Sequence, residues 1–434
     1  MRAKGGRRDE RPPPAGGVVI DTGAAQVRVA AATPAGRDVL CAPNAIARTR
    51  PGIRRQVLVA DEIETKCIDY GGLQLRLPVE RGMFVDWQAQ KAVWDRALVC
   101  VFDRLRGESG GSPWDSFNAL RGRTVLVTEP YFCLPEQQRA MDALMFEWYG
   151  AEALWRICPA QLAAFGVERG GKRPECVLVV DCGHSYTHAV PVVHDRVQWD
   201  AVRRLDIGGK VLTSLLKMQF SFRQWNMMDE TFLTDKVKAA SCFVAAAACG
   251  TEERDGAPHF WSFAELVDLF HEHRDNAVVQ HYVLPDYARP GDVADAETKY
   301  GYVLAGPRRG KKSTPEDSAL DEFIAGRANT LAEAAAGEQP PETDHQVLML
   351  GQERYQLCEA LFAPNRIGLE QGSLAELVAA SINTAPAEAQ PLLWSNIVLM
   401  GGGARIAGLR RRLHQEVRML APDDVPVDVY LADD

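Results

Sequence analysis

The chain carries the same short motif twice, an apolar strand that ends in Asp-x-Gly. The first copy spans Gly17–Gly23 and the second spans Val177–Gly183. Runs of small and β-branched residues predict buried strands, and the glycine permits the tight turn that follows. Two such turns facing each other can hold a nucleotide's phosphates, with backbone N–H groups on the oxygens and the aspartates on a hydrated Mg²⁺. The repeat therefore predicts two similar halves.

A third glycine-rich turn follows a late apolar strand, within Ile397–Gly403. A base or ribose could rest on its backbone without obstruction by side chains. Each of the three motifs is weak alone, because strand followed by turn is the plain alternative for any single copy. Their order and spacing favour the nucleotide interpretation.

Composition restricts the class of protein. The 434 residues are 46% hydrophobic and 25% charged, with a formal net charge of −9. This is typical of a soluble globular chain of about two to four domains and not of a nucleic-acid-coating protein. No apolar run approaches the roughly 20 residues of a membrane span, so we expect no membrane association.

The N-terminal residues 1–16 are basic and proline-rich without an apolar core, which predicts a disordered tail and not a secretory signal. Ten cysteines occur without a CxxC pair, which favours a reducing compartment over disulfides or a zinc site. Histidines cluster twice, but without cysteines or ordered carboxylates nearby, so no metal site is predicted; they are His184 and His188, and His271, His273 and His281.

Strands interleaved with helices predict an α/β fold in two halves, 17–175 and 176–434. A polar, low-complexity stretch at about 307–346 predicts an exposed insertion. Hydrophobic periodicity predicts strands at Val18–Asp21, Gln26–Ala30, Val125–Pro130 and His188–Val193, and helices at Gln88–Leu105, Pro135–Tyr149, Lys210–Phe220, Asp235–Cys249, Leu374–Ile382 and Arg405–Leu420.

The two phosphate turns and the late Gly-Gly-x turn resemble those of the actin, Hsp70 and sugar-kinase superfamily. Other stretches resemble actins in particular: Leu144–Glu147, Thr128–Pro130, Leu361–Pro364 with Ile367-Gly368, and Asn396–Gly402. The match is sharpest to the actin-related protein 6 family, in Ala201–Lys210, Arg223–Thr231, Glu129–Phe132 and Glu416–Arg418. The resemblance covers Gly17 to Tyr430 apart from the insertion.

This resemblance implies an actin-like ATPase fold, with two ribonuclease-H-like halves, smaller inserted subdomains, and closure on ATP. It also implies a nuclear scaffold subunit of a chromatin-remodelling complex that exchanges an ordinary nucleosomal histone for its variant. The implied partners are a Snf2-type motor subunit, a small zinc-finger subunit, and, through the complex, the nucleosome and variant histone dimers. Contact surfaces are expected in the insertion and in Arg223–Glu230.

Carried over residue by residue, the resemblance implies that ATP with Mg²⁺ is bound by Asp21, Gly23, Arg28, Asp181, Gly183, Lys238, Gly401, Gly402 and Gly403. Three positions depart from actin. Ala24 replaces a serine, Arg28 a phosphate-facing lysine, and Ala239 a glutamate that holds the ribose or base.

Two further departures concern hydrolysis. Pro159 falls where actin has a water-positioning glutamine, although Gln161 is close by, and His184 falls where actin has a water-orienting aspartate. Because phosphoanhydride cleavage depends on positioning the water, we expect little hydrolysis and no catalytic residue. Two alternatives stay open: that no nucleotide binds, and that the chain is an active ATPase or phosphotransferase of the superfamily.

The segment Arg50–Asp69 occupies the place of actin's filament-contacting loop. It carries charges and no long apolar tip, so no self-polymerisation is expected; the charged residues are Arg54, Arg55, Lys66, Asp61, Glu62 and Glu64. Family members continue beyond the end of this chain with a Trp-x-Gly-Gly segment. Its absence would leave an apolar surface on the first half open.

Overall fold

The structure, a computed structural model, describes residues 16–33, 36–50, 55–106, 116–169, 171–247, 261–273, 276, 278–287, 299–304 and 346–432. The basic tail and the insertion expected at 307–346 therefore lie outside the described residues, apart from Gly16 and Gln346. The chain divides into two compact units, one of residues 1–48, 56–67 and 75–159, the other of residues 49–55, 68–74 and 160–434. The boundary predicted between the halves lies after residue 175.

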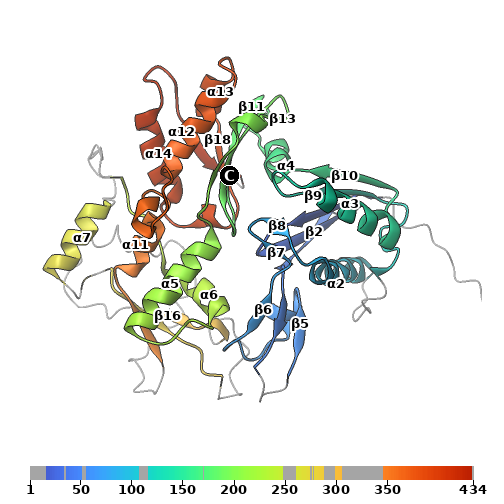
Figure 1. Cartoon of the computed structure of the whole chain (residues 1–434), viewed down its shortest axis with the longest axis horizontal. Helices are drawn as coiled ribbons and strands as arrows, with labels where there is room; N and C mark the ends of the chain where they lie inside the picture. The colour runs from blue at the N-terminus through green and yellow to red at the C-terminus, as the bar shows by residue number, and fades with distance from the viewer. Residues whose placement is uncertain are drawn as a thin grey trace, which may run out of the picture. The chain divides into compact units, whose positions relative to one another are not determined.

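The first unit is built on a five-stranded sheet in the order β10-β9-β1-β2-β3 (Figure 1). Its strands are β1 (Val18–Thr22), β2 (Gln26–Thr33), β3 (Gly36–Pro43), β9 (Thr124–Thr128) and β10 (Ala153–Ile157). β1 and β2 form an antiparallel hairpin, while β1 and β9 run parallel. The strands expected at Val18–Asp21, Gln26–Ala30 and Val125–Pro130 are thus confirmed.

Helix α2 (Trp87–Arg106) packs on β2 and β3, and its buried Trp94 and Leu98 join the core of this unit. Helix α3 (Pro135–Ala143) continues into a π-helical turn, η2 (Leu144–Trp148), so the helix expected to Tyr149 changes its hydrogen-bond pattern near its end. The smaller elements are β4 (Ile46–Arg48), β5 (Val57–Val59), α1 (Glu62–Thr65), β6 (Gln74–Arg76), β7 (Val79–Glu80) and β8 (Met83–Phe84).

The second unit contains a six-stranded sheet in the order β13-β12-β11-β18-β19, with β14 also paired to β12. Its strands are β11 (Cys176–Cys182), β12 (Thr187–Val193), β13 (Arg196–Val197), β14 (Arg203–Leu205), β18 (Ile397–Met400) and β19 (Val429–Leu431). A three-stranded sheet, β16-β15-β17, is formed by β15 (Gln280–Val283), β16 (Tyr302–Leu304) and β17 (Val347–Leu350).

Helices of the second unit surround these sheets, and α12, β12 and β14 pack together (Figure 1). The helical elements are α4 (Pro159–Gly166), η3 (Trp199–Ala201), α5 (Gly209–Arg223), α6 (Thr231–Ser241), α7 (Phe263–Glu272), α11 (Glu353–Glu359), η4 (Pro364–Ile367), α12 (Leu374–Thr384), α13 (Gln390–Trp394), η5 (Gly403–Arg405) and α14 (Leu409–Leu420). Helix α12 begins with a capping box in which the Ser373 hydroxyl and the Glu376 carboxylate accept each other's backbone N–H.

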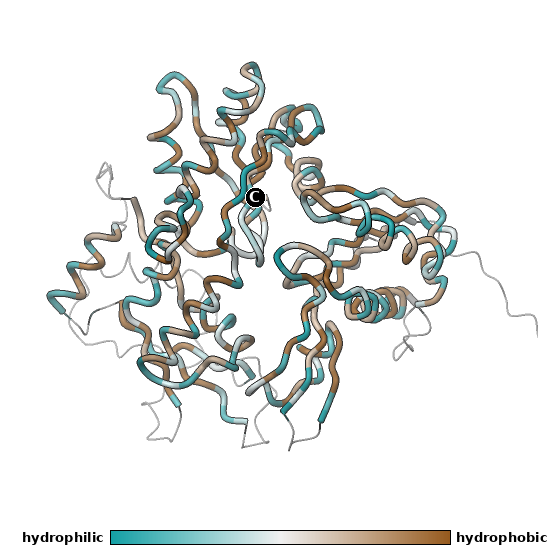
Figure 2. Tube along the Cα trace, in the orientation of Figure 1, coloured by the Kyte–Doolittle hydropathy of each residue, from teal (hydrophilic) through white to brown (hydrophobic). Residues whose placement is uncertain are grey.

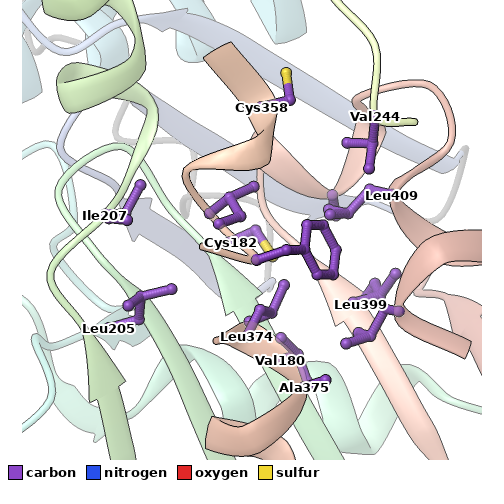
Figure 3. Close-up of a cluster of buried hydrophobic side chains, with 14 of the residues drawn as sticks. Val180, Cys182, Leu205, Ile207, Val244, Cys358, Leu374, Ala375, Leu399 and Leu409 are labelled. Atoms are coloured by element: carbon purple, nitrogen blue, oxygen red, sulfur yellow. The ribbon is translucent and has the colours of Figure 1, made fainter. Parts of the chain in front are cut away.

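Apolar side chains from β11, β18, α12 and α14 form the core of the second unit. Val180, Leu374 and Leu399 are fully buried and lie together in Figure 3. Figure 2 shows hydrophobic residues along the strands that meet in this core. Each such side chain contributes about 1.5–3 kcal/mol by leaving water, which holds the ends of β11 and β18 in fixed register.

One expected helix is wrong. A helix is predicted from Asp235 to Cys249, but α6 ends at Ser241 and the chain then runs extended to Ala247. The backbone of this stretch bonds to distant segments, with Val244 N donating to Ala407 O and Ala246 N to Trp261 O. Tertiary hydrogen bonds therefore override the helical composition, while residues 248 and 249 lie outside the described residues.

Helix α14 also starts later than expected, at Leu409 and not at Arg405. Gly408 has φ of +83°, so it cannot continue a helix and instead separates the short η5 turn from α14. Within the described part of the chain, no helix is both long and apolar enough to cross a membrane. The nine cysteines found there are all free thiols.

Candidate functional site

The first turn joins β1 to β2 and is closed by a backbone hydrogen bond of 2.9 Å from Gly23 N to Gln26 O. The carboxylate of Asp21 lies beside it. One of its oxygens accepts from Thr128 Oγ1 at 2.9 Å, and the other from Arg28 Nη1 at 3.2 Å. Arg28, expected to face phosphate, is thus paired with Asp21, although its side chain remains 47% exposed.

Buried polar groups hold this turn from behind. Asn44 donates to Gly23 O at 2.9 Å and to Gln90 Oε1 at 3.1 Å, and both amide side chains are fully buried. The indole N–H of Trp94 donates to Thr22 Oγ1 at 3.1 Å. Because these donors come from other elements of the first unit, tertiary hydrogen bonds reinforce the turn that the local sequence favours.

The second turn joins β11 to β12, and Gly183 N donates to Tyr186 O at 2.9 Å just as Gly23 N does to Gln26 O in the first. The start of α5 packs against it. Gly209 N donates to Gly183 O at 3.0 Å, and Lys210 N donates to His184 O at 2.8 Å. Two backbone bonds therefore fix the helix end to the turn.

Gly208 allows this approach because it has no side chain. A Cβ at this position would lie 2.5 Å from His184 O and 2.7 Å from Tyr186 N, both of them backbone atoms. The late turn lies on the other side of the same strand end. There Gly401 has φ of +87°, and a Cβ on it would lie 2.6 Å from Cys182 O.

A compact charged cluster lies at the side of the second turn. The ammonium of Lys238 has three acceptors, Gly209 O at 3.1 Å, Thr213 Oγ1 at 2.7 Å and Asp235 Oδ1 at 2.6 Å. An ammonium has three N–H donors, so Lys238 is saturated by its own chain. Burial raises the pKa of Asp235, but the charge of Lys238 and the hydrogen bonds from Lys238 and Thr213 outweigh it, and the net pKa is lowered.

Two histidines near the second turn are held neutral. Burial lowers the pKa of His184 to about 4, and the nearby Asp235 only partly offsets this. Burial, with the positive charge of Arg204, lowers the pKa of His188 to about 4 as well. At neutral pH the position where the resemblance expects a water-orienting aspartate therefore carries an uncharged imidazole.

Gln161, close to the other expected water-positioning site at Pro159, makes a hydrogen bond within its own unit. Pro159 is the first residue of α4, and Gln161 in the same helix donates its side-chain amide to Asp195 O at 2.6 Å. Gln161 thus supports the turn between β12 and β13.

Within each unit, the candidate residues of that unit lie close together. In the first unit, Asp21, Gly23 and Arg28 meet at one turn. In the second unit, the two glycine-rich turns and the Lys238 cluster are contiguous, which brings together Asp181, Gly183, Lys238, Gly401, Gly402 and Gly403. Sequence reasoning missed Thr213 and Asp235; the spacing of Asp235 three residues before Lys238 on a helix was an available signal.

These turns suit a phosphate group. Ala24 and Ala25 in the first turn, and Ser185 in the second, have no acceptor for their N–H groups among the described residues. Successive unpaired N–H groups form a concave site for anionic oxygens. The residues present therefore fit a nucleotide phosphate. No cluster of three or more metal-ligating side chains occurs in the described ranges.

The chain is similar to known proteins over most of its length. The sequence model of the family Actin matches residues 13–434. Actin-like protein ARP6 of Cryptococcus neoformans is 33% identical over 420 residues, 96% of this chain and 76% of the relative. Actin-related protein 6 of Oryza sativa subsp. japonica is 32% identical over 90% of this chain and 83% of its own length. For Actin-related protein 6 of Drosophila melanogaster the identity is 30%, over 96% and 89%.

The fold is therefore the actin-like ATPase fold, as predicted. The chain belongs to the actin family and, within it, to the actin-related protein 6 family.

Replacing Gly208 tests the packing of α5 on the second turn. We expect Gly208→Ala to lower the apparent melting temperature by about 5–10 °C, because the new Cβ overlaps backbone atoms that cannot move independently. Gly402→Ala is the matched control: a Cβ there meets no atom within 4 Å, and we expect a shift within about 1 °C. Equal shifts in differential scanning fluorimetry would contradict the packing argument.

The neutral histidines predict a pH dependence of stability. The pKa of His184 is about 4 in the folded chain against an ordinary 6.5, so the unfolded chain takes up a proton between these values that the folded chain does not. Because this proton uptake favours the unfolded chain, the free energy of unfolding is highest above pH 6.5 and declines as the pH falls towards 4. We expect His184→Gln to reduce the slope of apparent melting temperature against pH in that window. His414→Gln, which removes an exposed histidine of the same unit, is measured alongside as the control for the substitution itself.

Proposed function

We propose that this chain is a non-filamentous nuclear scaffold subunit of a chromatin-remodelling complex that exchanges an ordinary nucleosomal histone for its variant. Its proposed partners are a Snf2-type motor subunit and a small zinc-finger subunit, with the nucleosome and variant histone dimers reached through the complex. Membership of the actin-related protein 6 family supports the proposal. The observations that carry the non-catalytic part are that His184 is uncharged at neutral pH and that the Gln161 amide donates to Asp195 O.

Cleavage of a phosphoanhydride needs groups that orient the attacking water and stabilise charge. His184 stands in place of the expected carboxylate and is neutral. The side-chain amide of Gln161 donates its hydrogen bond to Asp195 O. Each missing group of this kind removes a factor of about 10²–10⁴ in rate. We therefore propose that bound ATP is hydrolysed very slowly, and that the active ATPase or phosphotransferase alternative is the less favoured function.

ATP with Mg²⁺ remains the proposed ligand. Within the first unit the turn at Gly23, and within the second unit the turn at Gly183, would each offer unpaired N–H groups to phosphate oxygens, and each turn carries one aspartate suited to a hydrated cation, Asp21 or Asp181. The cation, when bound, neutralises phosphate charge. Asp21 is already fixed by Thr128 and Arg28, so its contribution is to hold the turn in shape and to accept hydrogen bonds from water at the site.

The described part of the filament-loop segment supports the absence of self-polymerisation. Asp61 makes two hydrogen bonds of 2.8 Å with Arg96, and Lys66 pairs with Glu62 at 2.7 Å. Charges that form pairs within the first unit do not build an apolar contact for a neighbouring subunit. Arg54 lies outside the described residues.

The stretch Arg223–Glu230 is the proposed contact surface for the motor subunit. Gln224 bonds both backbone groups of Met349, donating to its O at 2.7 Å and accepting from its N at 2.8 Å, while Trp225 Nε1 donates to Val347 O at 3.2 Å. These side chains cover the edge of β17, so strand addition there is blocked. Phe222 beside them is 92% exposed, as a side chain that packs on a partner would be.

Affinity purification from nuclear extract tests the proposed assembly. We expect the tagged chain to recover a Snf2-type motor subunit, a small zinc-finger subunit and variant histones, identified by mass spectrometry. Trp225→Ala should reduce recovery of the motor subunit severalfold, whereas Trp199→Ala should not; these two tryptophans are 44% and 46% exposed. Recovery of none of these proteins by the unmodified chain would contradict the assignment.

A steady-state ATPase assay in polymerising salt tests the non-catalytic part. We expect turnover well below that of polymerised actin measured alongside, because both water-orienting groups are missing. The same samples should remain in the supernatant after high-speed sedimentation. Turnover equal to that of actin, or a pelleted fraction that grows with concentration, would contradict the proposal.

A further inference from the structure

We propose that Asp235 is the residue that accepts hydrogen bonds from the ribose hydroxyls of the nucleotide, and that Lys238 and Thr213 are positioning residues that hold it. This inference rests on the nucleotide binding of the proposed function. It assigns Asp235 a role that the carried-over residue set did not contain, and it changes the role of Lys238 from ligand contact to support.

The two oxygens of this carboxylate differ in their surroundings. Oδ1 accepts from Lys238 Nζ at 2.6 Å and from Thr213 Oγ1 at 2.9 Å. Oδ2 has no hydrogen-bond partner within the described ranges, and the Asp235 side chain is 50% exposed while that of Lys238 is 11% exposed. The carboxylate is thus fixed through one oxygen and presents the other to solvent, which is the arrangement of a pre-organised acceptor.

The acceptor lies beside the nucleotide turn of its own unit. Lys238 Nζ reaches Gly209 O at 3.1 Å, and Gly209 N in turn donates to Gly183 O at 3.0 Å. A Cβ on Gly209 would lie 3.5 Å from His184 Nδ1 and 3.6 Å from Lys238 Nζ, so the imidazole and the ammonium flank the same backbone position. A continuous chain of hydrogen bonds therefore links Asp235 through Lys238 and Gly209 to Gly183.

The chemistry selects the ligand group. An ionised carboxylate accepts hydrogen bonds and cannot donate them, so it suits hydroxyl groups and repels phosphate. A ribose carries two neighbouring hydroxyls. Lys238 has no N–H left to offer them, because all three are used within the chain.

The position on α6 also fits. Ala239, which stands where the resemblance expects a glutamate for the ribose or base, follows Asp235 by four residues and so lies on the same helix face one turn later. A carboxylate lost at Ala239 is thus replaced by one a turn earlier. If Asp235 instead only competed with nucleotide for Lys238, its removal would tighten binding, so the two roles predict opposite signs.

Binding of ATP, 2′-deoxy-ATP and 3′-deoxy-ATP to the purified full chain, measured by calorimetry with Mg²⁺ present, tests this role. We expect the unmodified chain to bind ATP about tenfold more tightly than at least one deoxy analogue, since a hydrogen bond to a charged acceptor is lost. Asp235→Asn should weaken ATP binding about tenfold and remove most of that preference. Thr213→Val should reduce the preference partly, with Thr213→Ser restoring it.

Asp423→Asn, which removes an exposed carboxylate elsewhere in the same unit, is the matched control and should leave binding unchanged. Unchanged or tighter ATP binding by Asp235→Asn, with an unaltered ribose preference, would overturn the inference while leaving the proposed nucleotide binding in place. If the unmodified chain bound none of the three nucleotides, the nucleotide part of the proposed function would fail together with it.

Discussion

The second unit depends on the close approach of the Gly208 backbone to the turn between β11 and β12. Because no side chain separates them, the N-terminus of α5 bonds directly to Gly183 and His184. Gly209 O, fixed by this contact, becomes the anchor for Lys238. The late glycine-rich turn packs on Cys182 from the other side, so three segments far apart in the sequence share one rigid corner.

The charged groups at this corner are satisfied by their own chain. All three N–H groups of Lys238 donate hydrogen bonds, and Oδ1 of Asp235 accepts two. In the first unit Asp21 is likewise held by Thr128 and Arg28. Such fixed groups can orient a ligand at little entropic cost, but the neutral His184 cannot orient an attacking water as an aspartate would. This balance supports the proposal of a site that holds a nucleotide and cleaves it only very slowly.

The strands and turns of the site could be predicted because their signals are local. The apolar runs at Val18–Thr22 and Cys176–Cys182, each followed by glycine, determine strand and turn without reference to the rest of the chain. The extended run after Ser241 could not be predicted in this way, because its backbone N–H groups donate to Ala407 and Trp261, which are distant in the sequence. The saturation of Lys238 was equally hidden, since one of its acceptors is the backbone of Gly209 on another helix.

Family membership shows an actin fold, and the proposal of a structural role for it rests on the neutral His184 and the hydrogen-bonded Gln161. The most direct test of this account is the identity of the nucleotide that the protein retains. The chain is loaded with ATP and Mg²⁺, freed of unbound nucleotide by gel filtration, kept at 25 °C for about an hour, and denatured for anion-exchange chromatography. The account predicts that the released nucleotide is ATP; release of ADP as the main species would contradict it.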